Sequence, residues 1–168
     1  NEKQSSCECL QTCCRLLASR CQEGSCRLVS MLNHLSHLPW LGVLAGSFAF
    51  ALLGGLWFAV LFKKAYAAAL ERTDLSDQRP GALFIVGPLA CGVVITLTNA
   101  LLMRALAVAT LGAALEFGLL SGLGYLVPMT VNIAINPNFP RPLAYSAVNA
   151  PYFLLGNLCN AGLLFALA

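Results

Sequence analysis

The sequence predicts an all-α integral membrane protein: four transmembrane helices preceded by a short polar N-terminal leader. Apolar residues make up 58% of the 168-residue chain and charged residues only 10%. Soluble domains are usually about 45–50% apolar and about 25% charged. One compact domain of this length could not bury so much apolar surface. This composition, together with several long uncharged stretches, excludes an ordinary soluble enzyme and a disordered chain.

Four stretches have the length that a helix needs to cross a bilayer. About 20 residues, each rising 1.5 Å, span a hydrocarbon layer roughly 30 Å thick. We therefore predict spans at residues 40–62, 81–103, 108–135 and 144–168, within a transmembrane domain covering residues 31–168. These stretches do not alternate between apolar and polar residues as barrel strands would. The boundary between the second and third spans contains no glycine or proline that would mark a turn.

Residues 1–30 form a polar, cysteine-rich leader that holds six of the eight cysteines. Their spacing differs from the paired C-x2-C pattern of zinc sites, so the metal signal is weak. The leader also lacks the continuous apolar core of a signal peptide. We expect it to be unstructured, with a short interfacial helix or acylated cysteines as the alternatives.

Small residues and prolines suggest how the helices pack. Small side chains that recur every four residues allow helix backbones to approach closely in lipid. Two such stripes are present, one in the first span (Ser47, Ala51 and Gly55) and one in the third (Thr110, Ala114, Gly118 and Gly122). Prolines 88, 128 and 151 are expected to bend or interrupt their spans.

Glu116 is the one carboxylate inside a predicted span, about 12 Å from its start at Val108. An ionised carboxylate at that depth costs several kcal/mol. We therefore expect the side chain to face the bundle interior, with Arg104 as a candidate partner, or to be protonated. It lies about 200° around the helix from Ala114 and Gly118, away from the small-residue stripe. Two interpretations of Glu116 remain open: it belongs to a proton- or cation-coupled site, or it has a structural role.

Asparagines form a second candidate group inside the spans. Carboxamides both donate and accept hydrogen bonds, so they can either join helices or line a polar path. The group consists of Asn99 in the second span and Asn149, Asn157 and Asn160 in the fourth.

Two functional hypotheses follow. In the first, the chain is a small solute or ion carrier or channel, with Glu116 and the asparagines lining a polar intramembrane path. In the second, it is a non-transporting structural or assembly protein of the membrane. No nucleophile elbow, phosphate-binding loop, zinc-protease helix or dinucleotide fingerprint is present, so we expect neither an enzyme nor a cofactor.

The partners follow from composition and size. A net charge of +3 is too small to indicate a nucleic-acid partner. The expected partners are the lipid bilayer and a second copy of the chain, because four short helices enclose little volume. We expect the chain to be an integral, multi-pass membrane protein. The sequence does not identify the membrane.

One motif at the end of the first span resembles that of an uncharacterised membrane family, domain of unknown function 1761. The sequence GGLWF at Gly54–Phe58 is followed by LFKK at Leu61–Lys64 and then by Tyr66. This is similar to the family pattern G-x-x-W-Y…L-F-G-K-x-W. The chain departs from the pattern at Phe58, Lys63 and Tyr66, where the family usually has Tyr, Gly and Trp.

A second motif resembles the final loop and last helix of the same family. It runs from Val131-Asn132 through Arg141-Pro142 to Val148–Ala150 and Tyr152. Together the two motifs place the likeness over about residues 41–168, outside the leader. The resemblance implies a divergent member with a small four-helix membrane fold, and it implies no activity.

Overall fold

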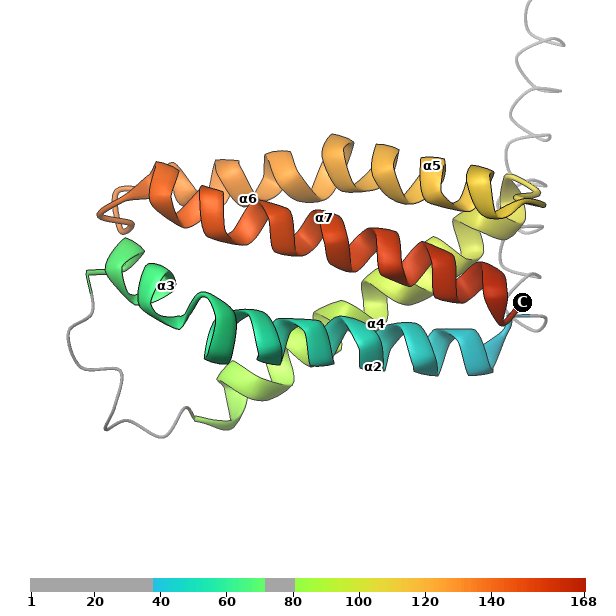
Figure 1. The fold of residues 1–168 in the computed structure, drawn as a ribbon, viewed down its shortest axis with the longest axis horizontal. Helices are drawn as coiled ribbons and strands as arrows, with labels where there is room; N and C mark the ends of the chain where they lie inside the picture. Colours follow the sequence, from blue (N-terminus) through green and yellow to red (C-terminus); the bar gives the residue numbers. More distant parts are fainter. Residues whose placement is uncertain (1–37, 72–80) are drawn as a thin grey trace, which may run out of the picture. The chain divides into compact units, whose positions relative to one another are not determined.

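The computed structural model of the protein describes residues 38–71 and 81–168 (Figure 1). All regular structure in these two ranges is helical, which confirms the predicted all-α class. The α-helices are α2 (Trp40–Leu56), α3 (Lys63–Ala69), α4 (Ala82–Ala105), α5 (Leu111–Ser121), α6 (Val127–Ala134) and α7 (Pro142–Ala166), and the π-helical turns are η2 (Trp57–Leu61) and η3 (Gly122–Leu126). The predicted leader at residues 1–30 and most of the charged loop after α3 lie outside the described residues.

The elements join into four long helical segments that match the predicted spans to within about three residues at each end. α2 continues into η2, and α5 continues through η3 into α6, while α4 and α7 are each single helices. In both π-helical turns the following N–H donates to a carbonyl five residues earlier, Phe62 to Trp57 at 2.8 Å and Val127 to Gly122.

Three of these segments, not four, are both long and apolar enough to cross a membrane. They are Trp40–Leu61, Ile85–Ala105 and Leu111–Ala134. Hydropathy therefore supports three of the four predicted spans, and the fourth, α7, stays a prediction. That helix has 25 residues and no charge, but it carries Ser146 and three asparagines, which lower its hydropathy.

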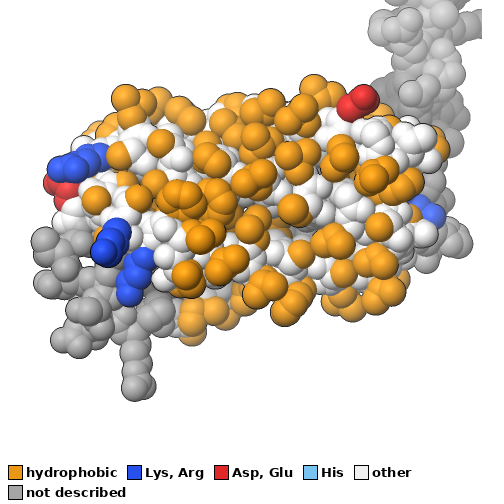
Figure 2. Space-filling model, viewed as in Figure 1, with side chains coloured by type: hydrophobic (Ala, Val, Ile, Leu, Met, Phe, Trp, Pro, Cys, Tyr) orange, Lys and Arg blue, Asp and Glu red, His pale blue; other side chains and the backbone are white. Residues whose placement is uncertain are grey.

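α7 is the helix around which the others pack. It contacts α2, α5 and α6 along its length and also touches α3, η3 and α4 (Figure 1). Its polar side chains are turned inward, with Asn157 and Asn160 each only 1% exposed. Large apolar side chains cover the outer surface instead (Figure 2), for example Leu83 at 78% exposed. The bundle thus has polar groups in its centre and an apolar exterior.

The small-residue stripe of α5 packs against α7 as expected. A Cβ atom added to Gly118 would lie 3.0 Å from the Ala161 Cβ, and one added to Gly122 would lie 2.9 Å from the Leu154 Cδ1. Ala114 is completely buried in the same contact region. Thr110 has a different role, because it is the N-cap of α5 and its side chain accepts a hydrogen bond from the Ala113 N–H at 3.2 Å.

On α2 the close contacts are made by other positions than the predicted stripe. Gly42, Gly46 and Gly54 face α7, and a Cβ on Gly46 would lie 3.0 Å from the Asn160 Oδ1. Gly55 has no atom within 4 Å of such a Cβ. The four-residue spacing of small residues on α2 was therefore predicted correctly. The face of α2 that makes the contact is rotated from the predicted one.

The turn between α4 and α5 forms without the glycine or proline that usually marks a turn. Ala107 adopts a left-handed conformation with φ of 51°, the position where glycine usually ends a helix. The Val108 N–H donates to the Met103 carbonyl at 2.9 Å and the Ala107 N–H to Arg104 at 3.0 Å. A non-glycine residue in this conformation costs about 1–2 kcal/mol. Met103 is buried and Val108 packs against the same core cluster, which helps to hold the turn.

None of the three prolines ends its helical segment, so the predicted interruption is wrong, while the predicted bend stays a prediction. Pro88 lies inside the continuous helix α4, and Pro151 lies inside α7. Pro128 occupies the second position of α6, directly after the π-helical turn η3. A wider turn at that point accommodates a residue that has no N–H to donate.

Candidate functional site

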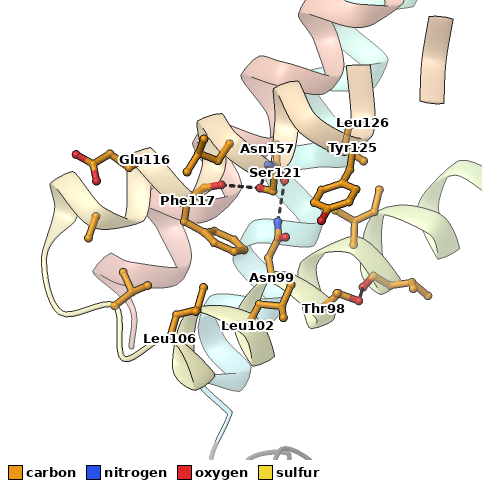
Figure 3. Close-up of a pocket in the computed structure, with 15 residues that line it drawn as sticks. Thr98, Asn99, Leu102, Leu106, Glu116, Phe117, Ser121, Tyr125, Leu126 and Asn157 are labelled. Carbon is orange, nitrogen blue, oxygen red and sulfur yellow. Dashed lines mark hydrogen bonds between the residues drawn. The ribbon is translucent and has the colours of Figure 1, made fainter. Parts of the chain in front are cut away.

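The Asn157 carboxamide joins three helices at the centre of the bundle. Its Oδ1 accepts a hydrogen bond from the Asn99 Nδ2 of α4 at 2.7 Å. Its Nδ2 donates to the Gly118 carbonyl and to the Ser121 Oγ of α5, each at 2.8 Å. The Ser121 hydroxyl in turn donates to the Phe117 carbonyl at 2.7 Å. Figure 3 shows these groups meeting between α4, α5 and α7.

One turn further along α7, Asn160 makes a second connection to α4. Its Nδ2 donates to the Thr96 Oγ1 at 2.6 Å, and the Thr96 hydroxyl donates to the Gly92 carbonyl at 2.9 Å. The Asn160 Oδ1 is buried and has no hydrogen-bond partner among the described residues. It lies against Gly46 of α2, whose missing side chain makes room for it. The Asn157 and Asn160 bonds together attach α4 to α7.

Asn149 does not take part in these connections between helices. Its Nδ2 donates to the Tyr145 carbonyl at 2.8 Å, one turn earlier in the same helix. The side chain lines a separate cavity of about 630 Å³ between α2, α4 and α7. The structure therefore brings together Asn99, Asn157 and Asn160 of the predicted group and leaves Asn149 apart.

Glu116 does not face the bundle interior as expected. The residue is exposed, and its carboxylate points away from the asparagines (Figure 3). It makes no ion pair with Arg104; the ion pair within the described ranges joins the Arg141 Nε to the Glu71 Oε1 at 3.0 Å. An exposed position avoids burying a charge inside the bundle, and the side chain lies within two turns of the start of α5. In those same ranges, no three His, Cys, Asp or Glu side chains come together to hold a metal ion.

A groove of about 630 Å³ lies between α4 and α5, and we call it the α4–α5 groove. Asn99, Asn157 and Ser121 form its polar floor, while its walls are mostly apolar (Figure 3). Glu116 lies at its edge. The apolar wall residues include Val94, Leu102, Leu106, Phe117, Leu120 and Leu126.

An aromatic cluster stabilises the opposite part of the bundle. The Trp57 Nε1–H donates to the Val148 carbonyl of α7 at 3.0 Å. Phe50, Phe58 and Phe153 pack around Tyr152, with ring centroids 4.9–5.4 Å apart. Trp57, Phe58 and Tyr152 belong to the two sequence motifs quoted above, so these motifs hold α2 against α7.

Sequence reasoning missed two partners of Asn157, namely Ser121 and the backbone carbonyl of Gly118. The position of Ser121, three residues after Gly118 on the helix, was an available signal for the side chain. The Asn157 side chain can reach the Gly118 carbonyl only because Gly118 has no side chain between α5 and α7. Identification of this second partner requires the three-dimensional packing of α5 on α7.

Comparison with known proteins gave one match. The family model described as "Protein of unknown function (DUF1761)" matches residues 41–165. No curated protein and no solved structure matches the chain. The matched range contains all four helical segments except the end residues Trp40 and Ala166, and it includes the asparagines and the α4–α5 groove.

Proposed function

We propose that this chain, which belongs to the DUF1761 family of proteins of unknown function, is a four-span membrane protein with a structural or assembly role. In this proposal the buried carboxamides hold the helices together and do not form a path for a transported solute. The observation that carries it is the Asn157 carboxamide, which uses its oxygen and its nitrogen on partners in α4 and α5.

The distribution of side chains supports a membrane location. On the face that Figure 2 shows, the exterior between the two ends of the bundle is mostly apolar, and charges gather toward the ends. At one end of the bundle, α3 begins with Lys63 and Lys64, and Arg141 directly precedes α7. Arg104 lies instead at the C-terminus of α4. An exterior of this kind is costly in water but matches a hydrocarbon layer bounded by two polar interfaces.

The position of α7 supports counting it as the fourth span. Its 25 residues extend about 37 Å, longer than the hydrocarbon layer, and none is charged. Two of the three asparagines that lower its hydropathy, Asn157 and Asn160, are buried against the other helices and have hydrogen-bond partners there. Lipid would therefore meet few of the polar groups of this helix.

The hydrogen-bond pattern favours a structural role over a transport role. A solute path needs polar groups that exchange partners with the solute as it passes. The Asn157 amide and the Ser121 hydroxyl are already bonded within the bundle. The carboxylate that a proton-coupled carrier would use, Glu116, is outside the cluster.

A carrier is the second candidate function, and one observation favours it. Glu116, Asn99 and Asn157 all line the α4–α5 groove. The carboxylate residue and two of the asparagines of the predicted polar path therefore border the same groove.

The variant Glu116→Gln separates the two candidates. A structural role predicts that purified protein in sealed proteoliposomes shows no proton-linked flux with either Glu or Gln at position 116. It also predicts an unchanged melting temperature, because Glu116 makes no ion pair. The measurements are internal pH from a trapped dye and thermal unfolding in detergent. Glu71→Gln is the control for the flux measurement, since Glu71 is an exposed glutamate at the other end of the bundle, where it pairs with Arg141.

A wild-type proton flux that is lost in Glu116→Gln and kept in Glu71→Gln would overturn the structural proposal. It would establish the carrier instead.

A further inference from the structure

We propose that the α4–α5 groove binds an uncharged amphiphile dissolved in the bilayer, with an apolar chain along the groove and a hydroxyl group at Asn99. This site goes beyond the structural role proposed above, and it does not require transport.

The groove exists because α4 crosses the bundle obliquely (Figure 1). α4 packs against α2 and touches α7, but its contacts with α5 are few. The two hydrogen bonds to Asn157 and Asn160 fix the middle of α4. α4 and α5 meet at the short turn that joins them and separate from that turn toward the N-terminal part of α4, and the groove lies between them (Figure 1).

The walls of the groove select an apolar and uncharged ligand. Leu102, Leu106 and Phe117 line it, and the charged residue at its edge, Glu116, directs its carboxylate away from the groove (Figure 3). A charged group placed there would lose its hydration without gaining a counterion, which is unfavourable. The groove volume of about 630 Å³ is within the range of small-molecule sites.

The groove opens on the apolar exterior of the bundle. Leu120 and Tyr125 line it and are 73% and 76% exposed. A ligand can therefore enter sideways from the bilayer without passing through the bundle.

Asn99 supplies the polar contact. It is only 5% exposed, and one Nδ2 hydrogen is donated to Asn157. Its second N–H and its Oδ1 make no other hydrogen bond among the described residues, and the side chain lies on the groove floor. By contrast, the Ser121 and Thr98 hydroxyls already donate to the Phe117 and Val94 carbonyls. A ligand hydroxyl both donates and accepts, so it matches the two groups that remain on Asn99.

The test uses the full-length protein in phosphatidylcholine vesicles with a photoreactive hexadecanol that carries a diazirine in its chain. We expect adducts on peptides from α4 and α5, reduced at least fivefold by excess unlabelled 1-hexadecanol. Hexadecanoic acid at pH 8 should compete at least tenfold less well, because its carboxylate is charged. Adducts spread over the exterior of all helices without competition would mean bulk lipid contact and overturn the proposal. Equal competition by the acid would also overturn it.

The variant Leu102→Trp fills the groove without removing a hydrogen bond of the asparagine cluster. It should reduce the competed labelling at least fivefold. Leu83→Trp is the matched control, because Leu83 lies on the same helix, is exposed and lines neither cavity; its labelling should equal that of the wild type. Unchanged labelling in a folded Leu102→Trp protein would contradict the site. If that variant does not fold, the wild-type adduct map and the acid competition decide the question.

Discussion

Replacing Asn157 with leucine should lower the free energy of unfolding by about 2–4 kcal/mol. The substitution removes three hydrogen bonds that connect α7 to α4 and α5. Hydrogen bonds between membrane helices contribute about 0.6 kcal/mol on average and up to about 1.7 each. The buried Asn99 amide would also lose its partner, which adds a desolvation cost. The measurement is unfolding in mixed detergent and SDS micelles, followed by circular dichroism.

Asn149→Leu is the matched control for this experiment. Asn149 is also a buried asparagine of α7, but the hydrogen bond that its side chain donates stays within α7. We expect it to cost less than about 1 kcal/mol, since no helix–helix hydrogen bond is lost. Equal losses in the two variants would show that the Asn157 cluster has no special role in holding the helices together.

Gly118→Ala should destabilise the bundle by about 1–3 kcal/mol, the usual cost of overpacking a tight contact. The added Cβ would lie 3.0 Å from the Ala161 Cβ and 3.3 Å from the Asn157 carbonyl oxygen and the Leu158 Cα. Because two of these three atoms belong to the backbone of α7, relief requires the helices to move apart. That movement would also lengthen the hydrogen bond from Asn157 to the Gly118 carbonyl. The same unfolding assay measures the effect.

Gly124→Ala serves as the comparison, since no atom lies within 4 Å of a Cβ at position 124. Alanine is favoured over glycine in helices by about 1 kcal/mol, so this variant should be neutral or slightly more stable. If Gly118→Ala raised stability as much as Gly124→Ala does, the close approach of α5 and α7 would be refuted.

Hydropathy predicted the positions of the helices well, because a long uncharged segment has few alternatives to a helix of that length. It was less informative at α7, where buried asparagines lower hydropathy although the helix is central. No glycine or proline marks the α4–α5 turn in the sequence, because Ala107 adopts the left-handed conformation that glycine normally adopts at the end of a helix. The N-cap at Thr110 was the available signal for the start of α5.

The candidate site was predictable only in part. The sequence suggested that asparagines could join helices, but the pairing of Asn99 with Asn157 and of Asn160 with Thr96 depends on how α4 crosses α7. The orientation of Glu116 could have been predicted. It lies about 200° from the stripe of Ala114 and Gly118, and that stripe faces α7. The cost of a charge in lipid favoured an interior side chain, and that orientation is wrong, whereas the alternative of a protonated side chain stays a prediction.

The central claim is that α7 crosses the membrane as the polar centre of a four-span bundle, and its topology tests this most directly. Single cysteines would be introduced by Asn138→Cys, in the turn before α7, and by Ala168→Cys, after its end, with the native cysteines replaced. A membrane-impermeant thiol reagent would then be added to sealed vesicles before and after permeabilisation. We predict that one position is labelled from outside and the other only after permeabilisation. Labelling of both positions from the same side would contradict the account.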